Sequence, residues 1–133
     1  MAIVYDFDGM RKADGCGKDD EVCVSGSLGR KIVRIRSNDP SVVENYLRNV
    51  LAEHGVTDEM LNVVMRVKND LVETYIVPRR AFRPWQYDAE PDKQLLISPA
   101  SVEVGGILIT PVEEHFERIG ADDVESIYGQ VCF

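Results

Sequence analysis

Two β-forming stretches separated by only two residues constrain the fold of this chain more than any other feature. The first stretch covers residues 60–68 and the second covers residues 71–77. Asn69 and Asp70, which lie between them, tolerate the positive φ angles of a two-residue hairpin turn. So short a turn permits only antiparallel pairing, and the pattern therefore predicts a β-hairpin. In the first stretch, every second residue is apolar: Leu61, Val63, Met65 and Val67.

The residues before the hairpin predict one strand and one helix. Residues 31–37 alternate between two faces, which is typical of a strand. Asp39 can cap a helix that has Pro40 in its first turn, and Gly55 can end that helix. Apolar side chains recur with helical spacing between these positions: Val43, Tyr46, Leu47, Val50 and Leu51. We expect an amphipathic helix over residues 40–54.

The residues after the hairpin predict a long loop and short strands. Residues 81–93 contain too many prolines and charges for a regular element, so we expect a surface loop there. Residues 95–97 are expected to form a short strand. A further strand is expected at 107–109, directly after Gly105 and Gly106.

Two capping patterns predict helices at the end of the chain. Thr110 and Glu113 match a capping box, which places a helix after them through about Ile119. Asp122 and Glu125 repeat that pattern before the last helix. The apolar stripe of this last helix consists of Val124, Ile127, Tyr128 and Val131.

The order of these elements indicates the fold class. No strand-helix-strand crossover repeats along the chain, so we predict an α+β domain with an antiparallel sheet of about five strands and helices packed on it. A chain of 133 residues fits a single domain. Residues 1–28 mix glycine with acidic residues and are expected as an irregular arm or hairpin with a small strand at 22–25. The domain is expected to occupy residues 29–133.

The charge of the chain restricts its partners. Fifteen basic and 23 acidic residues leave a net charge of −8. Such a charge argues against general binding of nucleic acid or of an anionic membrane, because both partners are themselves negative. A local basic site is still compatible with this composition.

The cysteines and the chain start predict the compartment. Cys16, Cys23 and Cys132 form neither a C-x-x-C pair nor a spacing typical of a metal site. We therefore expect reduced, mainly structural thiols and no metal. The first residues lack a basic start followed by a long apolar run, so a cytoplasmic protein is expected.

A basic and aromatic segment follows the hairpin and is the predicted binding site. Arg79, Arg80 and Arg83 are candidates for binding phosphate, because guanidinium groups match phosphate oxygens in a bidentate way. Trp85 and Tyr87 are candidates for stacking on a base. Gly105 and Gly106 would allow a ligand to approach the backbone closely, and they complete the predicted set.

Each of these residue types also has an ordinary structural role. Arginines at the end of a strand commonly pair with carboxylates of the same protein. Aromatic rings commonly pack a loop onto a sheet, and paired glycines commonly serve backbone geometry. The two histidines of the chain, His54 and His115, fall in helix patterns, where surface or capping roles are expected. No catalytic residue is predicted.

Several motifs together resemble a known family. They are Val77-Pro78-Arg79-Arg80, Arg83-Pro84-Trp85-Gln86-Tyr87, Leu95-Leu96-Ile97-Ser98-Pro99-Ala100-Ser101-Val102, Gly105-Gly106-Ile107-Leu108-Ile109-Thr110-Pro111 and Ile127-Tyr128-Gly129-Gln130-Val131. From Gly29 onward, the chain resembles the C-terminal part of a bacterial (Bacteroides-type) family of unknown function. That family is related to the histidine-triad (HIT) and galactose-1-phosphate uridylyltransferase superfamily, which includes GDP-galactose phosphorylases.

The resemblance implies a HIT-like half with the ancestry of a nucleotidyltransferase or phosphorylase. In such enzymes a His-x-His motif supplies the attacking imidazole, and this chain has no such motif. Phe82 stands where the family has histidine, and Glu103 where it has aspartate. The resemblance therefore implies a non-catalytic domain that binds a nucleotide or sugar phosphate, or that acts as an assembly module.

Two further implications concern partners. The chain could form one half of a split enzyme with a separate histidine-bearing partner. A homodimer is also expected, because halves of this superfamily pair through their sheets and an unpaired sheet edge needs cover.

The start of the chain supports a competing hypothesis. Residues 3–9 resemble the nucleophile loop of haloacid-dehalogenase-type phosphatases, with Asp6 and Asp8 as its acids. Asp122 and Asp123 could be the distant metal-binding pair of such an enzyme. That fold requires repeated strand-helix crossovers, which the sequence does not predict, so this alternative ranks last.

Overall fold

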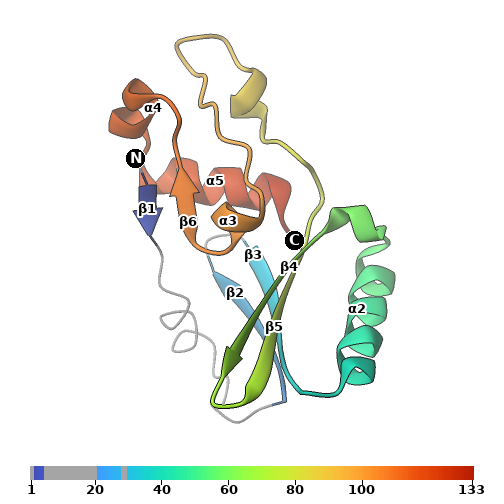
Figure 1. Ribbon diagram of the computed structural model, residues 1–133. Helices are drawn as coiled ribbons and strands as arrows, with labels where there is room; N and C mark the ends of the chain where they lie inside the picture. The colour runs from blue at the N-terminus through green and yellow to red at the C-terminus, as the bar shows by residue number, and fades with distance from the viewer. Residues whose placement is uncertain (1, 5–20, 28–29) are drawn as a thin grey trace.

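A four-stranded antiparallel sheet forms the centre of the protein. The computed structural model describes residues 2–4, 21–27 and 30–133. The strand order is β2-β3-β5-β4, and β1 pairs with β6 in a second, two-stranded sheet (Figure 1). The strands are β1 (Ala2–Val4), β2 (Val22–Ser27), β3 (Arg30–Arg36), β4 (Leu61–Lys68), β5 (Leu71–Pro78) and β6 (Ile107–Ile109). The α+β class with an antiparallel sheet is confirmed.

The predicted hairpin consists of β4 and β5. Lys68 lies opposite Leu71, and the register continues without interruption to Leu61 opposite Pro78. Asn69 and Asp70 have φ angles of 53° and 60°. Two consecutive positive φ angles are typical of the type I′ turn, whose twist matches that of the flanking strands.

Helix α2 (Pro40–His54) covers one face of the sheet. Its first turn is capped as predicted, since Asp39 Oδ1 accepts a hydrogen bond of 2.9 Å from the Ser41 amide. Gly55 ends the helix with a φ of 62°. Buried residues from the helix and the two central strands make the core of this face: Val33, Ile35, Val50 and Ile76.

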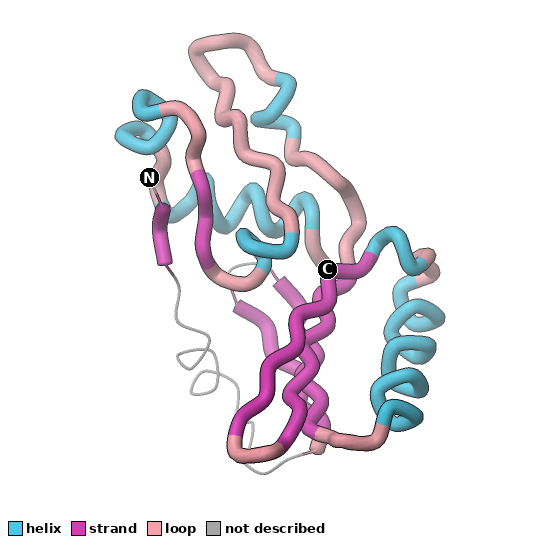
Figure 2. The backbone as a smooth tube through the Cα atoms, viewed as in Figure 1, coloured by secondary structure: helices cyan, strands magenta, loops and turns pink. Residues whose placement is uncertain are grey.

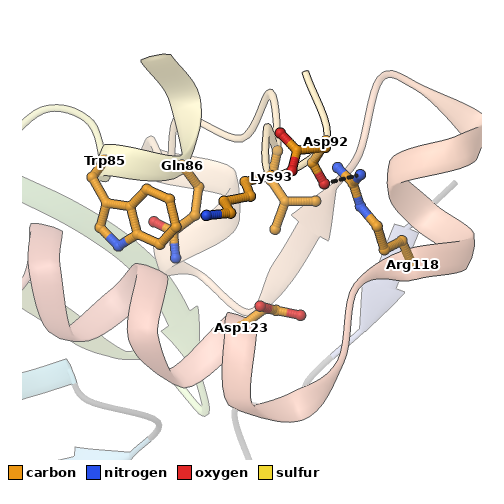
Figure 3. A pocket seen from close by; sticks show the side chains of 7 residues that line it. Trp85, Gln86, Asp92, Lys93, Arg118 and Asp123 are labelled. Carbon is orange, nitrogen blue, oxygen red and sulfur yellow. Dashed lines mark hydrogen bonds between the residues drawn. The ribbon is translucent and has the colours of Figure 1, made fainter. Parts of the chain in front are cut away.

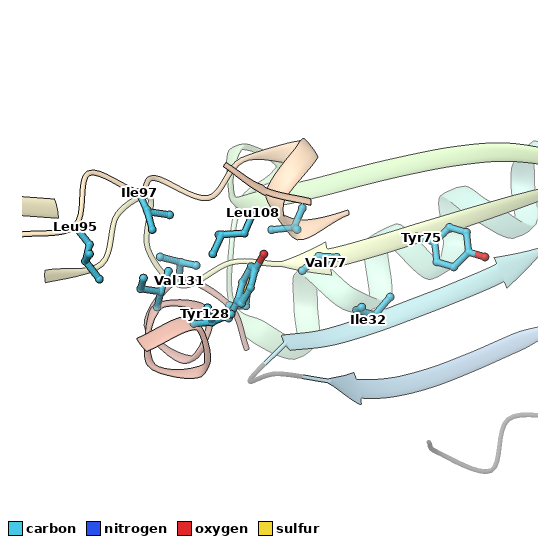
Figure 4. Close-up of a cluster of buried hydrophobic side chains, with 12 residues drawn as sticks. Ile32, Tyr75, Val77, Leu95, Ile97, Leu108, Tyr128 and Val131 are labelled. Carbon is cyan, nitrogen blue, oxygen red and sulfur yellow. The ribbon is translucent and has the colours of Figure 1, made fainter. Parts of the chain in front are cut away.

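The opposite face of the sheet carries the larger core (Figure 4). Helix α5 (Ala121–Val131) and the short helix α3 (Ser101–Val104) pack there together with β6. The whole predicted stripe of the last helix is buried: Val124, Ile127, Tyr128 and Val131. Arg30 is also buried, with its guanidinium 4.6 Å from the Tyr128 ring centroid and a 2.9 Å hydrogen bond to the Val104 carbonyl.

Several local predictions are wrong. Residues 95–97 form no strand, because Leu95 N donates to Gln86 O and Ile97 N to Leu95 O, although both side chains are buried. Their apolar character therefore reflects burial and not strand pairing. Helix α3 was not predicted, and the expected loop contains a 3₁₀ turn, η2 (Trp85–Asp88). Another 3₁₀ turn, η1 (Asp58–Met60), precedes β4.

Both predicted caps near the end of the chain are also wrong. Helix α4 (Glu113–Arg118) follows Val112, with no side-chain cap, while Thr110 is buried. Helix α5 begins one residue before Asp122. Its cap is formed by Asp123, whose carboxylate accepts a 2.9 Å hydrogen bond from the Gly120 amide.

The first 28 residues contribute strands to both sheets. β1 pairs with β6 and β2 pairs with β3, so the predicted small strand at 22–25 is present and extends to Ser27. The phosphatase-like acids Asp6 and Asp8 lie outside the described residues. All pairings between the described strands are antiparallel. Within the described ranges, no helix has the length and apolar character needed to cross a membrane.

The oxidation state of one cysteine differs from the prediction. Cys23 is disulfide-bonded, so the expectation of a reduced thiol is wrong there. Cys132 is a free, buried thiol at the end of α5. Burial raises the pKa of Cys132 to about 11, and the nearby Arg79 only partly offsets this effect.

Candidate functional site

The segment that follows β5 begins with a buried arginine. Arg79 is only 6% exposed. Its Nη2 donates to the carbonyl oxygens of Phe82 at 2.9 Å and of Ala81 at 3.2 Å. Its Nη1 donates to Asn62 Oδ1 at 3.2 Å. Burial lowers the pKa of Arg79, and the guanidinium ties the segment to the start of β4.

The two other candidate arginines are exposed and lie against different rings. The Arg80 guanidinium is 4.8 Å from the Phe133 ring centroid, and that of Arg83 is 4.2 Å from the Tyr87 ring centroid. Arg79 lies 6.0 Å from the centroid of a third ring, Phe82. Each of the three arginines predicted to bind phosphate thus has its own aromatic neighbour, and Tyr87 contacts an arginine of the same loop.

The turn η2 is held in place by α5. The Trp85 amide donates to Gln130 Oε1 at 2.8 Å. Gln86 is buried and accepts a 2.9 Å hydrogen bond from Gln130 Nε2, while its own amide donates to Ser126 at 3.3 Å. These bonds fix the backbone of the turn, whereas the Trp85 side chain remains 57% exposed.

Trp85 lines a small cleft between η2, the loop after it and the start of α5 (Figure 3). The cleft has a volume of about 210 Å³. Its charged lining residues are Asp92, Lys93, Arg118 and Asp123. We call this the Trp85 cleft.

Hydrogen bonds to the loop backbone hold Arg118 at one side of the Trp85 cleft. It donates to the Asp92 carbonyl oxygen at 2.9 Å and also to the Gln94 carbonyl oxygen. An arginine has five N–H donors, so this arrangement leaves donors for a ligand. Lys93 is exposed, and its side chain extends in the direction of Trp85 and Gln86 (Figure 3). Two cations, an indole ring and two carboxylates therefore share one small space.

The other predicted residues lie outside this cleft. Gly105 ends α3, and Gly106 has a φ of 108° and donates to the Glu103 carbonyl oxygen at 3.0 Å, so the pair turns the chain from α3 into β6. His115 is buried and its Nδ1 accepts from the Leu96 amide at 3.2 Å, which differs from the expected surface or capping role. His54 lies at the end of α2 and stacks on Phe133.

Of the seven predicted site residues, only Trp85 lines the cleft. Lys93 and Arg118 were missed because neither belongs to a motif, and 25 positions of sequence separate them. Only the fold of the loop against α4 and α5 brings them together (Figure 2). In the described part of the chain, no group of three His, Cys, Asp or Glu side chains is placed to hold a metal ion.

Comparisons with protein-family models, with curated proteins and with solved structures find no significant match. The resemblance to the HIT and galactose-1-phosphate uridylyltransferase superfamily therefore stays a prediction.

Proposed function

We propose that this chain is a non-catalytic binding domain and that the Trp85 cleft holds a nucleoside monophosphate or a sugar phosphate. The observation that carries the proposal is an exposed indole ring, on a hydrogen-bonded turn, in a cleft that also contains Lys93 and Arg118. A rigid, exposed ring offers a surface on which a base or a sugar can pack. The two cations offer donors to a phosphate group.

The carboxylates of the cleft agree with a ligand that carries hydroxyl groups. Asp92 and Asp123 would repel a phosphate, but they can accept hydrogen bonds from a sugar. The volume of about 210 Å³ lies below the roughly 300–1,000 Å³ of common ligand pockets, which favours a monophosphate over a dinucleotide. Among the described residues that line the cleft there is no serine, cysteine or histidine, and we propose binding without chemistry.

Fluorescence titration tests the proposal directly, because Trp85 is the only tryptophan of the chain. AMP, GMP and galactose 1-phosphate are the ligands, and adenosine and galactose are the controls without phosphate. We expect saturable quenching by at least one phosphorylated ligand and weaker binding of its control. Lys93→Gln should weaken binding about tenfold, since a hydrogen bond to a charged group contributes about 1.5 kcal/mol.

Arg80→Gln and Arg83→Gln are the matched controls. Both remove one exposed positive charge, as Lys93→Gln does, but neither residue lines the cleft. We expect binding to be unchanged in both. Loss of binding in Arg80→Gln with normal binding in Lys93→Gln would favour the arginine clamp predicted from the sequence. Absence of any saturable signal would overturn the proposal, and turnover by the chain alone would contradict its non-catalytic part.

A further inference from the structure

A second surface, far from η2, is apolar and lies on an outer strand. β4 is at one edge of the four-stranded sheet, and β5 is the only described strand that pairs with it. Three apolar side chains of β4 are exposed: Val63 at 41%, Met65 at 58% and Val67 at 72%. We call them the β4 apolar row. They alternate along the strand, so all three point to the same face, which is the face that α2 covers over the two central strands.

A groove adjoins the β4 apolar row. It has a volume of about 360 Å³ and lies between the start of α2 and the hairpin. Its apolar lining includes Val43 and Leu47 from α2 and Met65 and Val72 from the hairpin. The helix therefore covers Leu61 of the outermost strand but leaves Val63, Met65 and Val67 exposed, and the apolar surface continues from the groove to the edge of the sheet.

The edge of β4 has little of the usual protection against pairing on the side of the sheet that α2 covers. Natural edge strands are kept short, interrupted by a bulge or proline, or given a charge that points inward. β4 has eight residues in unbroken register and contains no proline, and on the α2 side of the sheet it bears only apolar side chains. Its two cations, Arg66 and Lys68, lie on the other side, where Arg66 pairs with Glu73 at 2.6 Å. Such an edge accepts another strand readily.

The turn determines which backbone groups face this edge. In a two-residue hairpin, Lys68 and Leu71 form a hydrogen-bonded pair, and bonded pairs then alternate along the ladder. Val63, Met65 and Val67 are therefore in the non-bonded positions, and their N–H and C=O groups point away from β5. The same three residues thus present both apolar side chains and unpaired backbone groups at the edge.

We propose that a second copy of this chain binds there, through antiparallel β4–β4 pairing centred on Met65. In this register Met65 lies opposite Met65 of the other copy, and Val63 opposite Val67. Every member of the β4 apolar row then meets another member. The two four-stranded sheets would become one continuous sheet, with α2 of each copy on the same face.

The charged residues of the strand favour this register. On the other face, Arg66 lies opposite Val64 and Lys68 opposite Asn62, so neither cation meets its own copy. A register centred on Arg66 would place the two Arg66 side chains directly opposite each other, and like charges in that position are destabilising. A register centred on Val64 would place Val67 opposite Leu61. Leu61 already packs in the core under α2, so Val67 would have no exposed apolar side chain to pack against.

Cross-linking tests the register. Opposite residues of a bonded antiparallel pair have Cα atoms about 5.5 Å apart, within the range of a disulfide. Met65→Cys should therefore form a disulfide-linked dimer under mild oxidation. Val63→Cys is the matched control, because the two copies of Val63 would lie four residues apart, about 14 Å, too far for a bond. The buried Cys132 and the bonded Cys23 contribute little background.

Light scattering at protein concentrations up to about 1 mM tests the dimer itself. At that concentration, even a dimer with a binding free energy of only about −4 kcal/mol is half formed. We expect a wild-type dimer and an at least about 100-fold weaker Met65→Lys dimer, because two ammonium groups would meet at the centre of the interface. Val24→Lys, at an equally exposed position on the opposite edge strand, should leave the dimer intact. A wild-type monomer throughout, a monomeric Val24→Lys or equal cross-linking of Met65→Cys and Val63→Cys would each overturn the proposal.

Discussion

Replacing Arg79 distinguishes a structural role from the phosphate-binding role that the sequence predicts. Arg79→Met keeps most of the aliphatic stem but removes the donors that satisfy the carbonyl oxygens of Ala81 and Phe82. Losing a donor costs about 1–3 kcal/mol for an acceptor that is shielded from water, and both of these bonds are part-buried. The cost is smaller for the Phe82 carbonyl oxygen, which also accepts from Ser98 Oγ at 3.4 Å, and the relief of no longer burying a guanidinium offsets a further part. We expect a net loss of about 3 kcal/mol in the free energy of unfolding.

The matched control is the next residue. Arg80→Met removes an exposed guanidinium that lies 4.8 Å from the Phe133 ring centroid, and exposed cation–π pairs contribute about 0.5–1 kcal/mol. Urea titration at neutral pH measures both free energies. Dividing each loss by the average unfolding entropy of a chain of this length gives the fall in Tm. We expect a fall of about 10 °C for Arg79→Met and of at most about 4 °C for Arg80→Met.

The outcome of this pair of variants is decisive for Arg79. If Arg79→Met loses no more stability than Arg80→Met, the hydrogen bonds to the loop carbonyls do not stabilise the fold. Arg79→Lys adds a second check, because it keeps the charge but loses the planar fork that reaches two carbonyl oxygens. We expect it to recover less than half of the lost stability.

Two further predictions concern stability. The pKa of Cys132 is about 11 in the folded protein and 9.0 in the unfolded chain, so between these values the unfolded chain loses its proton first and stability falls as pH rises. Relative to Cys132→Ala, urea titrations of the wild type should show an extra loss of about 2 kcal/mol between pH 8 and pH 10.5, and parallel profiles would contradict this. Asp70→Gly should stabilise the hairpin by about 0.5 kcal/mol, because glycine adopts the φ of 60° without strain. A lower Tm for Asp70→Gly would refute that reasoning.

Most of the regular elements were predictable because local chemistry determines them. The Asn69 and Asp70 turn, the Asp39 cap and the Gly55 end each depend on residues within a few positions of one another. The same reasoning went wrong for residues 95–97, where buried apolar side chains belong to a loop, and for Thr110, which is buried and caps no helix. Alternation and capping patterns report local preference, and long-range packing can override either.

The candidate site was predictable only in part. The sequence singled out Trp85, whose exposed ring lines the cleft. It grouped Arg79 with Arg80 because they are neighbours, yet β5 directs one guanidinium into the protein and leaves the other at the surface. Lys93 and Arg118 carried no signal, since their proximity depends on how the loop folds against α4 and α5.

By itself, the sequence determined an antiparallel hairpin, an amphipathic helix and the α+β class, because turns, caps and periodicity act over a few residues. Only the tertiary structure decided which apolar residues of the hairpin are covered. Val63 and Met65 lie opposite the buried Ile76 and Thr74 of β5, on the same face of the sheet. Helix α2 covers that face over the central strands and Leu61, but it does not reach Val63, Met65 and Val67. Burial depends on which elements pack against a strand, and this physical difference separates a core residue from a surface that can bind a partner.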